Sequence, residues 1–344
     1  MKSRNAAAWA WFAGAAAFLV AAVLLGVAAG YASITPGQIA GTLVAKAVPG
    51  MEPPLNDRQL AVLVELRLPR VVLGAMVGAL LSVAGAAYQG VFRNPLADPY
   101  LLGAAGGAGL GATLVMAFGA AWFDGPRAMV PVAAFTGALL GVAAAYLLGR
   151  SAGRNGTASL VLAGVAVSSF LSAVQTLVQQ MRIDELQRIY AWLLGGLAKG
   201  GWEDVAMVAP YAILGTAVML VCGRLLDLLA LGDEKAVSLG LNTTAVRLVV
   251  IGAASLATAS AVAVAGLIGF VGIVVPHVVR RLVGTGYRLI LPMSLLCGAG
   301  FLVLVDVLAR TVIAPAELPL GVVTAFLGAP FFIVILRTTR HRAT

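Results

Sequence analysis

Charged side chains are scarce in the apolar segments of this sequence, and four of them stand at spacings that could do chemistry. Asp306 and Arg310 are four residues apart in FLVLVDVLAR, so one helix face would pair them. Arg67 and Arg70 stand at the start of another apolar segment, in ELRLPR. A guanidinium presents a planar fork of donors that fits a carboxylate or a phosphate. We expect Asp306 to form a structural pair, and we weigh two roles for the three arginines: anchoring to lipid headgroups or docking of an acidic protein surface.

The apolar segment 159–181 carries more hydroxyl and amide groups than any other. Gly164, Ser168, Ser172 and Gln175 recur there at helical spacing and would share one face. Such a face could line a pathway through the membrane, or it could pack against a neighbouring helix through its small residues. We prefer the pathway because no other segment is as polar.

The sequence lacks the motifs on which common enzyme classes depend. It contains no GxxxxGK[ST] loop for ATP phosphates, no HExxH and no GxSxG. Cys222 and Cys297 lie far apart in apolar segments, which indicates neither a disulfide framework nor a metal site. His277 follows Pro276 at a predicted helix end, where we expect an ordinary helix-end hydrogen bond, and His341 lies in a basic tail. We therefore expect no catalytic residue, no metal and no cofactor on this chain, and an intramembrane enzyme is disfavoured.

The elements that must position these residues are membrane-spanning helices. Of 344 residues, 61% are hydrophobic and 11% are charged, whereas soluble domains carry about 25% charged residues. Apolar runs of about 18 residues or more recur from end to end, and each could cross a bilayer. We predict an all-α membrane protein with a single domain over 1–344. Its ten predicted spans are 8–31, 62–92, 100–119, 128–149, 159–181, 205–222, 246–264, 266–279, 289–309 and 320–337, the seventh and eighth separated by a hint of a break at Gly266 and Gly269.

The distribution of charge orients these spans. Fourteen of the 23 basic residues, but four of the 14 acidic ones, fall on the side that holds the amino terminus. This bias places both termini in the cytoplasm. It also explains the net charge of +9 without nucleic acid as a partner. The first apolar run, 6–31, is longer than the core of about 7 to 15 residues in a cleavable signal, so we expect it to be a retained span.

The connections between spans carry further patterns. On the inside, 223–245 reads as two short helices broken at Gly232 and Gly240. On the outside, ITPGQIAGTLVAKAV reads as a short helix, and 182–204 carries aromatic residues that suit a membrane interface. The inner stretch RNPLADPYLLG, 93–103, reads as a turn in which Pro95 ends one helix while Asp98 and Pro99 begin the next. Its spelling recurs in outline 181 residues later, around Pro276, which indicates either an internal duplication or chance matching.

Long stretches of the sequence resemble the FecCD-type permeases, the membrane subunits of type II ATP-binding-cassette importers for iron-siderophores, haem and vitamin B12. The resemblance runs from about 34 to 337. The stretches that show it are ELRLPRVVLGAMVGALLSVAGAAYQGVFRNPLADPYLLGAAGGAGLGA, LLALGDEKAVSLGL, GLIGFVGIVVPHVVRRLVGTGYRLILPMSLLCGA, DVLAR and AELPLGVVTAFLGAPFFIVIL.

The resemblance implies the type II importer permease fold, about ten transmembrane helices per subunit, in the cytoplasmic membrane of a prokaryote. It implies a homodimer around a central path, two ATPase subunits that bind ATP and Mg beneath it, and a soluble binding protein outside.

The resemblance also implies roles for particular residues. Arg67, Arg70 and Arg310 would hold glutamates of the binding protein, and Thr157 would stand at a cytoplasmic gate. Ala158 replaces a second hydroxyl familiar from the vitamin B12 relatives. The segment 159–181 would line the path. The loop that contacts the ATPase would include Leu231, Gly232, Asp233, Glu234, Ala236, Leu239 and Gly240.

The resulting hypothesis is a permease subunit that imports an iron chelate, siderophore first and haem second, or vitamin B12, driven by a separate ATPase. The alternative from another class is an ion-coupled secondary transporter without an ATPase. That alternative expects a relay of acidic or His residues deep in the spans. The sequence offers no such relay apart from Asp306 and its neighbour Arg310.

Overall fold

The computed structural model describes the chain except residues 1, 31–34, 48–51, 123–125, 152–156 and 341–344. Within the described ranges every regular element is a helix, as predicted. The elements are α1 (Lys2–Ala28), α2 (Pro36–Ala47), α3 (Asp57–Ala61), the π-helix η1 (Val62–Arg67), α4 (Leu68–Phe92), α5 (Ala104–Trp122), α6 (Pro126–Ser151), α7 (Thr157–Met181), the 3₁₀ turn η2 (Ile183–Glu185), α8 (Leu186–Leu193), α9 (Trp202–Val221), α10 (Gly223–Ala230), α11 (Asp233–Ser238), α12 (Thr243–Ala265), α13 (Val271–Val283), α14 (Tyr287–Thr311) and α15 (Leu320–Arg340).

Each of the ten predicted spans has a helix in the structure. Among the described residues, seven helices are long and apolar enough to cross a membrane, and α5 and α15 carry shorter apolar stretches. The remaining span corresponds to α13, whose 13 residues cover about 20 Å, less than a bilayer core of about 30 Å. Helix α2 and the pair α10 and α11 confirm the short helices predicted in the connections, whereas α8, within 182–204, was not predicted.

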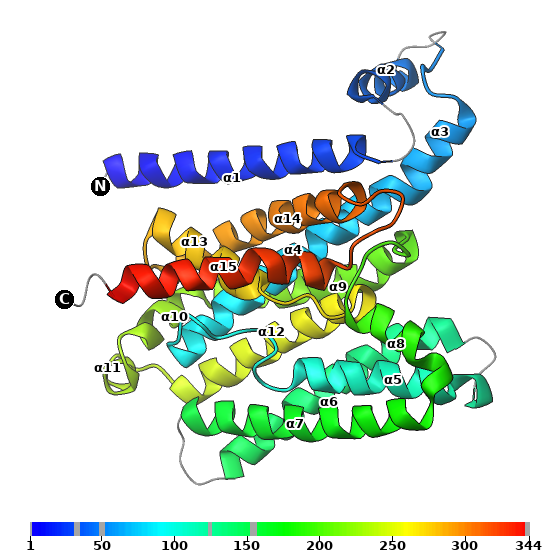
Figure 1. The fold of residues 1–344 in the computed structure, drawn as a ribbon. Coiled ribbons are helices and arrows are strands. Elements are labelled where there is room, and N and C mark those ends of the chain that lie inside the picture. The colour runs from blue at the N-terminus through cyan, green and yellow to red at the C-terminus, as the bar shows by residue number, and fades with distance from the viewer. Residues whose placement is uncertain (1, 31–34, 48–51, 123–125, 152–156, 341–344) are drawn as a thin grey trace.

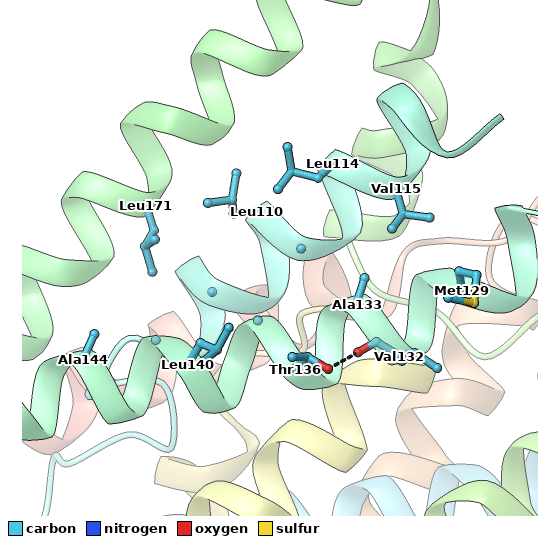
Figure 2. Close-up of a pocket in the computed structure, with 14 residues that line it drawn as sticks. Leu110, Leu114, Val115, Met129, Val132, Ala133, Thr136, Leu140, Ala144 and Leu171 are labelled. Atoms are coloured by element: carbon cyan, nitrogen blue, oxygen red, sulfur yellow. Dashed lines mark hydrogen bonds between the residues drawn. The ribbon is translucent and has the colours of Figure 1, made fainter. Parts of the chain in front are cut away.

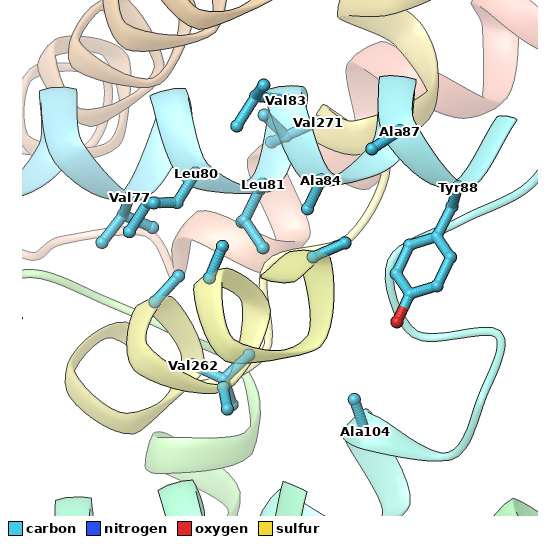
Figure 3. Packing of buried hydrophobic residues seen from close by; sticks show 14 of the residues in the cluster. Val77, Leu80, Leu81, Val83, Ala84, Ala87, Tyr88, Ala104, Val262 and Val271 are labelled. Atoms are coloured by element: carbon cyan, nitrogen blue, oxygen red, sulfur yellow. The ribbon is translucent and has the colours of Figure 1, made fainter. Parts of the chain in front are cut away.

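Helix α4 forms the centre of the bundle. Figure 1 shows it between α1, α13 and α14 on one side and α12 on the other, with α5, α6 and α7 beyond α12. The carboxyl-terminal half of α4 is buried at every residue from Leu80 to Phe92. Its apolar side chains meet Val262 of α12 and Val271 of α13 (Figure 3), and the Tyr88 hydroxyl shares a hydrogen bond of 2.7 Å with Ser255. The core therefore fixes α4 relative to the second half of the chain.

The break between the seventh and eighth spans is confirmed. Helix α12 ends at Ala265, Gly266 has φ +68°, and α13 begins at Val271. Phe270 has φ +68° as well, which is uncommon for a bulky residue and was not foreseen. Irregular backbone between apolar helices is tolerated where protein buries it or where it lines a cavity.

Two predictions about the inner turn are wrong. Helix α5 begins at Ala104, so Asp98 and Pro99 do not begin it. The Asp98 carboxylate instead accepts a hydrogen bond of 2.7 Å from the Tyr100 backbone N–H, within an irregular segment that extends to Gly103. The recurrence around Pro276 does not describe an equivalent turn, because Pro276 lies inside α13. Proline alone did not reveal which of the two sites is helical.

The prediction for His277 is wrong for the same reason. His277 lies within α13 rather than at its end, and neither ring nitrogen has a hydrogen-bond partner. Its ring packs edge-on against Phe331 of α15, with ring centroids 5.7 Å apart. The residue contributes a packing contact between the two helices.

Burial gives Asp98 a testable pH dependence. It raises the pKa of the carboxyl to about 6, against the opposing effect of the Tyr100 N–H bond. A raised folded pKa means that ionising Asp98 costs stability as pH rises from about 4 to about 6. Asp98→Asn keeps an oxygen that can accept from Tyr100. We expect thermal unfolding in detergent to show a more stable Asn variant above about pH 6 and no difference near pH 4. An equal difference at both pH values would contradict this.

Candidate functional site

The predicted outer arginines come together where α1, α4 and α14 meet. Arg70 donates from Nη2 to Asp306 Oδ1 at 2.8 Å and from Nη1 to Glu317 Oε1 at 2.9 Å. Arg310 lies 3.3 Å from Asp306 Oδ2 through its Nε, which confirms the predicted pair. Asp306 is thus shared by two arginines, one of them on a helix 236 residues away in sequence. Neither the bond of Arg70 to Asp306 nor that of Arg70 to Glu317 was predicted from the sequence.

The guanidinium groups of Arg67 and Arg310 cap the carboxyl-terminal end of α1. Arg67 donates to the Val27 carbonyl at 3.1 Å, and Arg310 donates to the carbonyls of Gly26 and Ala29 at 2.6 and 2.8 Å. The last carbonyls of a helix lack intrahelical partners and carry partial negative charge. Two buried cations satisfy them here. This structural role was not among the alternatives considered from the sequence, because nothing in ELRLPR or DVLAR points to α1.

A π-helix presents Arg67 to α1. The turn η1, Val62–Arg67, is wider than an α-turn, and the Trp202 indole N–H donates to the Val64 carbonyl within it at 2.9 Å. Arg67 and Arg70 consequently serve different neighbours although they are three residues apart. π-Turns of this kind are rare and are frequently found at functional sites.

We refer to Arg67, Arg70, Asp306, Arg310 and Glu317 as the outer cluster, after the side of the membrane predicted for it. Glu317 is its exposed member. Its side chain is 39% exposed, against 13% for Arg70 and 3% for Asp306. The hydrogen bond from Arg70 is the largest influence on Glu317 and holds the pKa of its carboxyl below the usual value. The carboxylate therefore stays charged at neutral pH. Glu317 accepts from Nη1 and Nη2 of Arg70, while Asp306 accepts from Nε and Nη2.

The predicted polar face of α7 lies mostly against α5. Glycines of α5 mark the contact: a Cβ at Gly106 would meet the Ser168 backbone, and one at Gly109 would meet the Gln175 amide. Gly164 packs against the Leu101 carbonyl in the same way. Ser172 remains exposed. The packing alternative thus accounts for three of the four positions, and pathway lining stays a prediction.

The opposite face of α7 is exposed and apolar. Leu162, Phe170 and Leu177 are each more than 60% exposed. Of the most apolar stretch of α7, 11% is buried, the smallest share among the seven long spans. Thr157, the predicted gate residue, is the first residue of this helix, and residues 152–156 before it lie outside the described residues.

The predicted coupling loop forms two short helices joined by a glycine. Gly232, at φ +104°, separates α10 from α11, and Gly240, at φ +83°, ends the segment. In α11 Ala236 is buried, while Glu234 and Val237 are exposed, as are Leu231 before the helix and Leu239 after it. Three exposed apolar side chains therefore lie close in sequence to an exposed carboxylate.

Ion pairs fasten this segment to the spans. Asp233 at the start of α11 lies 3.1 Å from Arg93 at the end of α4 and 2.6 Å from Arg247 in α12. Burial raises the pKa of Asp233, but the two arginines outweigh it and leave that pKa below its usual value. In α10, Asp227 accepts a hydrogen bond of 2.6 Å from the Tyr287 backbone N–H of α14.

Two apolar cavities lie along the helices. One, of about 620 Å³, runs between α5 and α6 and is closed by Leu171 of α7 (Figure 2). The Thr136 hydroxyl at its wall already donates to the Val132 carbonyl at 2.8 Å. The other, of about 700 Å³, lies at the break between α12 and α13, where Leu267 and Phe270 face Phe326 of α15.

Comparison with known proteins identifies the architecture. Residues 18–338 match the model of the FecCD transport family. The chain is 44% identical to the uncharacterised ABC transporter permease YvrB of Bacillus subtilis, over 82% of this chain and 80% of that one. It is 41% identical to the cobalamin import permease BtuC of Halobacterium salinarum, over 81% and 74%. It is 39% identical to the Fe(3+)-citrate import permease YfmD of Bacillus subtilis, over 83% and 84%.

A solved structure shares the fold. It is described as a metal-chelate type ABC transporter in an inward-facing conformation, and it aligns with a TM-score of 0.80 at 31% identity, over 94% of this chain and 98% of that one. The family match, the relatives and the shared all-helical fold agree with the resemblance drawn from the sequence. This chain is a multi-pass membrane permease that belongs to the FecCD transport family.

Proposed function

We propose that the chain imports a bulky iron chelate as a homodimer, driven by two separate ATPase subunits and supplied by a soluble binding protein on the outside. The surface on α11 carries this proposal. The apolar side chains of Leu231, Val237 and Leu239, on and beside this short helix, are exposed, and a partner protein would bury them. ATP and Mg would be bound by that partner.

Purification distinguishes this proposal from the ion-coupled alternative. An affinity-tagged chain should bring an ATPase with it, and proteoliposomes containing both, together with the binding protein, should take up cargo when ATP is supplied. Uptake driven by an ion gradient in the absence of the ATPase would favour the alternative. The ion-coupled alternative requires a relay of charged residues through the spans. Among the described residues the buried charged side chains are Arg67, Asp306 and Arg310, and all three belong to the outer cluster.

Substitutions in α11 test the coupling role. Gly232→Ala places a Cβ on a left-handed backbone, which costs about 1 to 3 kcal/mol and reorients α11. Glu234→Gln removes the exposed carboxylate. We expect both variants to hydrolyse ATP with little uptake while the binding protein still docks. Gly286→Ala is the matched control, since Gly286 is on the same side, has φ −76° and has open space for a Cβ. Normal uptake in both α11 variants would contradict the assignment.

Two substitutions in the outer cluster should change the docking affinity of the binding protein in opposite directions. Arg67 and Arg310 are committed to α1, so Arg70 is the member whose partner can be exchanged. A carboxylate of the binding protein would compete with Glu317 for the Arg70 guanidinium. Glu317→Gln should therefore raise the docking affinity, and Arg70→Gln should lower it, each by about fivefold or less at low salt. Surface plasmon resonance in nanodiscs would measure both. Affinities that do not move in either variant would remove Arg70 from the docking surface.

We place the translocation path beside the cavity at the α12–α13 break. Broken helices mark binding sites in many transporters, and this break lines an apolar cavity with Phe270 and Phe326. The exposed faces of α7 and α15 would then meet a second copy around it. For cargo we favour an iron-siderophore, then haem, then vitamin B12. Thermal-shift screening of the cognate binding protein against these three ligands would decide among them.

A further inference from the structure

A continuous series of contacts runs from the coupling segment to the cavity at the α12–α13 break. It begins at Asp233, which holds Arg93 at 3.1 Å. Arg93 directly follows α4 and has φ +51°, a left-handed conformation that directs the chain into the turn 94–103. Movement of α11 therefore acts on the residue that precedes this turn.

The turn is braced along its length. The Asn94 side chain accepts from the Leu96 N–H at 2.9 Å, and the Asp98 side chain accepts from the Tyr100 N–H at 2.7 Å. Asn and Asp side chains commonly hold such local turns. A braced turn passes a displacement on, whereas an unbraced loop would absorb it.

Tyr100 completes the series. Its hydroxyl donates to the Ile268 carbonyl and accepts from the Ile268 N–H, each at 3.1 Å. Ile268 lies in the break between α12 and α13, and its neighbours Leu267 and Gly269 line the 700 Å³ cavity. One side chain thus holds both backbone groups of Ile268, the residue between two members of the cavity wall.

We propose that Asp233, Arg93 and Tyr100 form a relay that transmits the movement of α11 through the turn 94–103 to the cavity wall. The proposal rests on the proposed function, since it requires an ATPase to move α11. Helix α11 depends on ion pairs for its position, because Ala236 is its one buried residue and Asp233 is held by both Arg93 and Arg247. Packing alone holds such a short helix weakly.

The relay is tested by the amount of cargo taken up per ATP hydrolysed. Wild-type and variant permeases would be reconstituted with the ATPase and the binding protein, with radiolabelled ferric hydroxamate, haemin and cobalamin as probes. Arg93→Gln removes the ion pair, and Tyr100→Phe removes both bonds to Ile268. Each should lower the ratio about two- to fivefold. Arg93→Lys, which keeps the charge, should restore most of it.

Links in series make a distinctive prediction for the double variant. Once one link is cut, cutting the other has no further effect, so Arg93→Gln with Tyr100→Phe should match the worse single variant. Arg188→Gln and Tyr190→Phe are matched controls, since Arg188 makes an exposed ion pair with Glu185 on the outer side and Tyr190 is exposed nearby. Neither control should change the ratio. Thermal unfolding of every variant would identify any loss of folding.

The outcomes separate the relay from the proposed function. A wild-type complex that hydrolyses ATP and takes up none of the three probes would overturn the proposed function. A coupled wild type whose Arg93→Gln and Tyr100→Phe variants perform like the controls would overturn the relay alone. Effects of the two substitutions that multiply would also overturn it, because they would then act independently.

Discussion

Replacing Asp306 by Asn is expected to lower the free energy of unfolding by about 3 to 5 kcal/mol. The carboxylate lies between the guanidinium groups of Arg70 and Arg310, and its side chain is 3% exposed. Removing one member of a buried ion pair leaves the remaining charge without compensation, which costs far more than the pair itself contributes. Here two arginines would lose the same partner. The end of α1, which Arg310 caps, should loosen with them.

Glu317→Gln is the matched control for this prediction. It also removes a carboxylate from Arg70, but Glu317 is 39% exposed, and exposed pairs contribute about 1 kcal/mol or less. Thermal unfolding in detergent, followed by size-exclusion chromatography, would compare the two variants. Equal losses would show that the burial of Asp306 does not matter, and an unchanged Asp306→Asn variant would contradict the role of the shared carboxylate.

The ten helices could be predicted because their cause is local. Apolar length, charge bias and punctuation by glycine and proline act within one segment, so hydropathy finds them. The pairing of Asp306 with Arg310 is equally local, since helical spacing brings them together. The pairing of Asp306 with Arg70 depends on how α4 and α14 pack, and no spacing in the sequence encodes that.

The misassigned residues share a physical reason. Proline is compatible with a turn, a first helical turn or a kinked helix interior, so Pro95 and Pro276 look alike in sequence and differ in structure. The polar stripe on α7 was ambiguous in a similar way, because small and hydroxyl-bearing residues suit both helix packing and a pathway. Phe270 gave no signal, since its left-handed backbone is imposed by the surrounding break.

The close crossing of α4 and α13 leads to the other large prediction. A Cβ on Gly85 of α4 would overlap the carbonyl group of Gly272 in α13. Backbone atoms cannot rotate away as a side chain can, so the helices would have to separate. Overpacking of this kind costs about 1 to 3 kcal/mol and occasionally more. We expect Gly85→Ala to lower the thermal midpoint clearly and Gly85→Leu to yield no monodisperse protein.

Gly252 of α12 provides the matched control for that crossing. It is also a helical glycine in an apolar span, but it is exposed and a Cβ there would meet open space. Gly252→Ala should be neutral or slightly stabilising, because alanine favours a helix over glycine by about 1 kcal/mol. Opposite signs at the two positions, measured in the same detergent, would establish that contact between α4 and α13 requires glycine. If Gly85→Leu folded as well as Gly252→Leu, the helices could not approach as closely as the structure places them. Gly272 of α13 also packs on Pro99. If α13 lay farther from α4, the turn 94–103 would therefore lack the support that the relay requires.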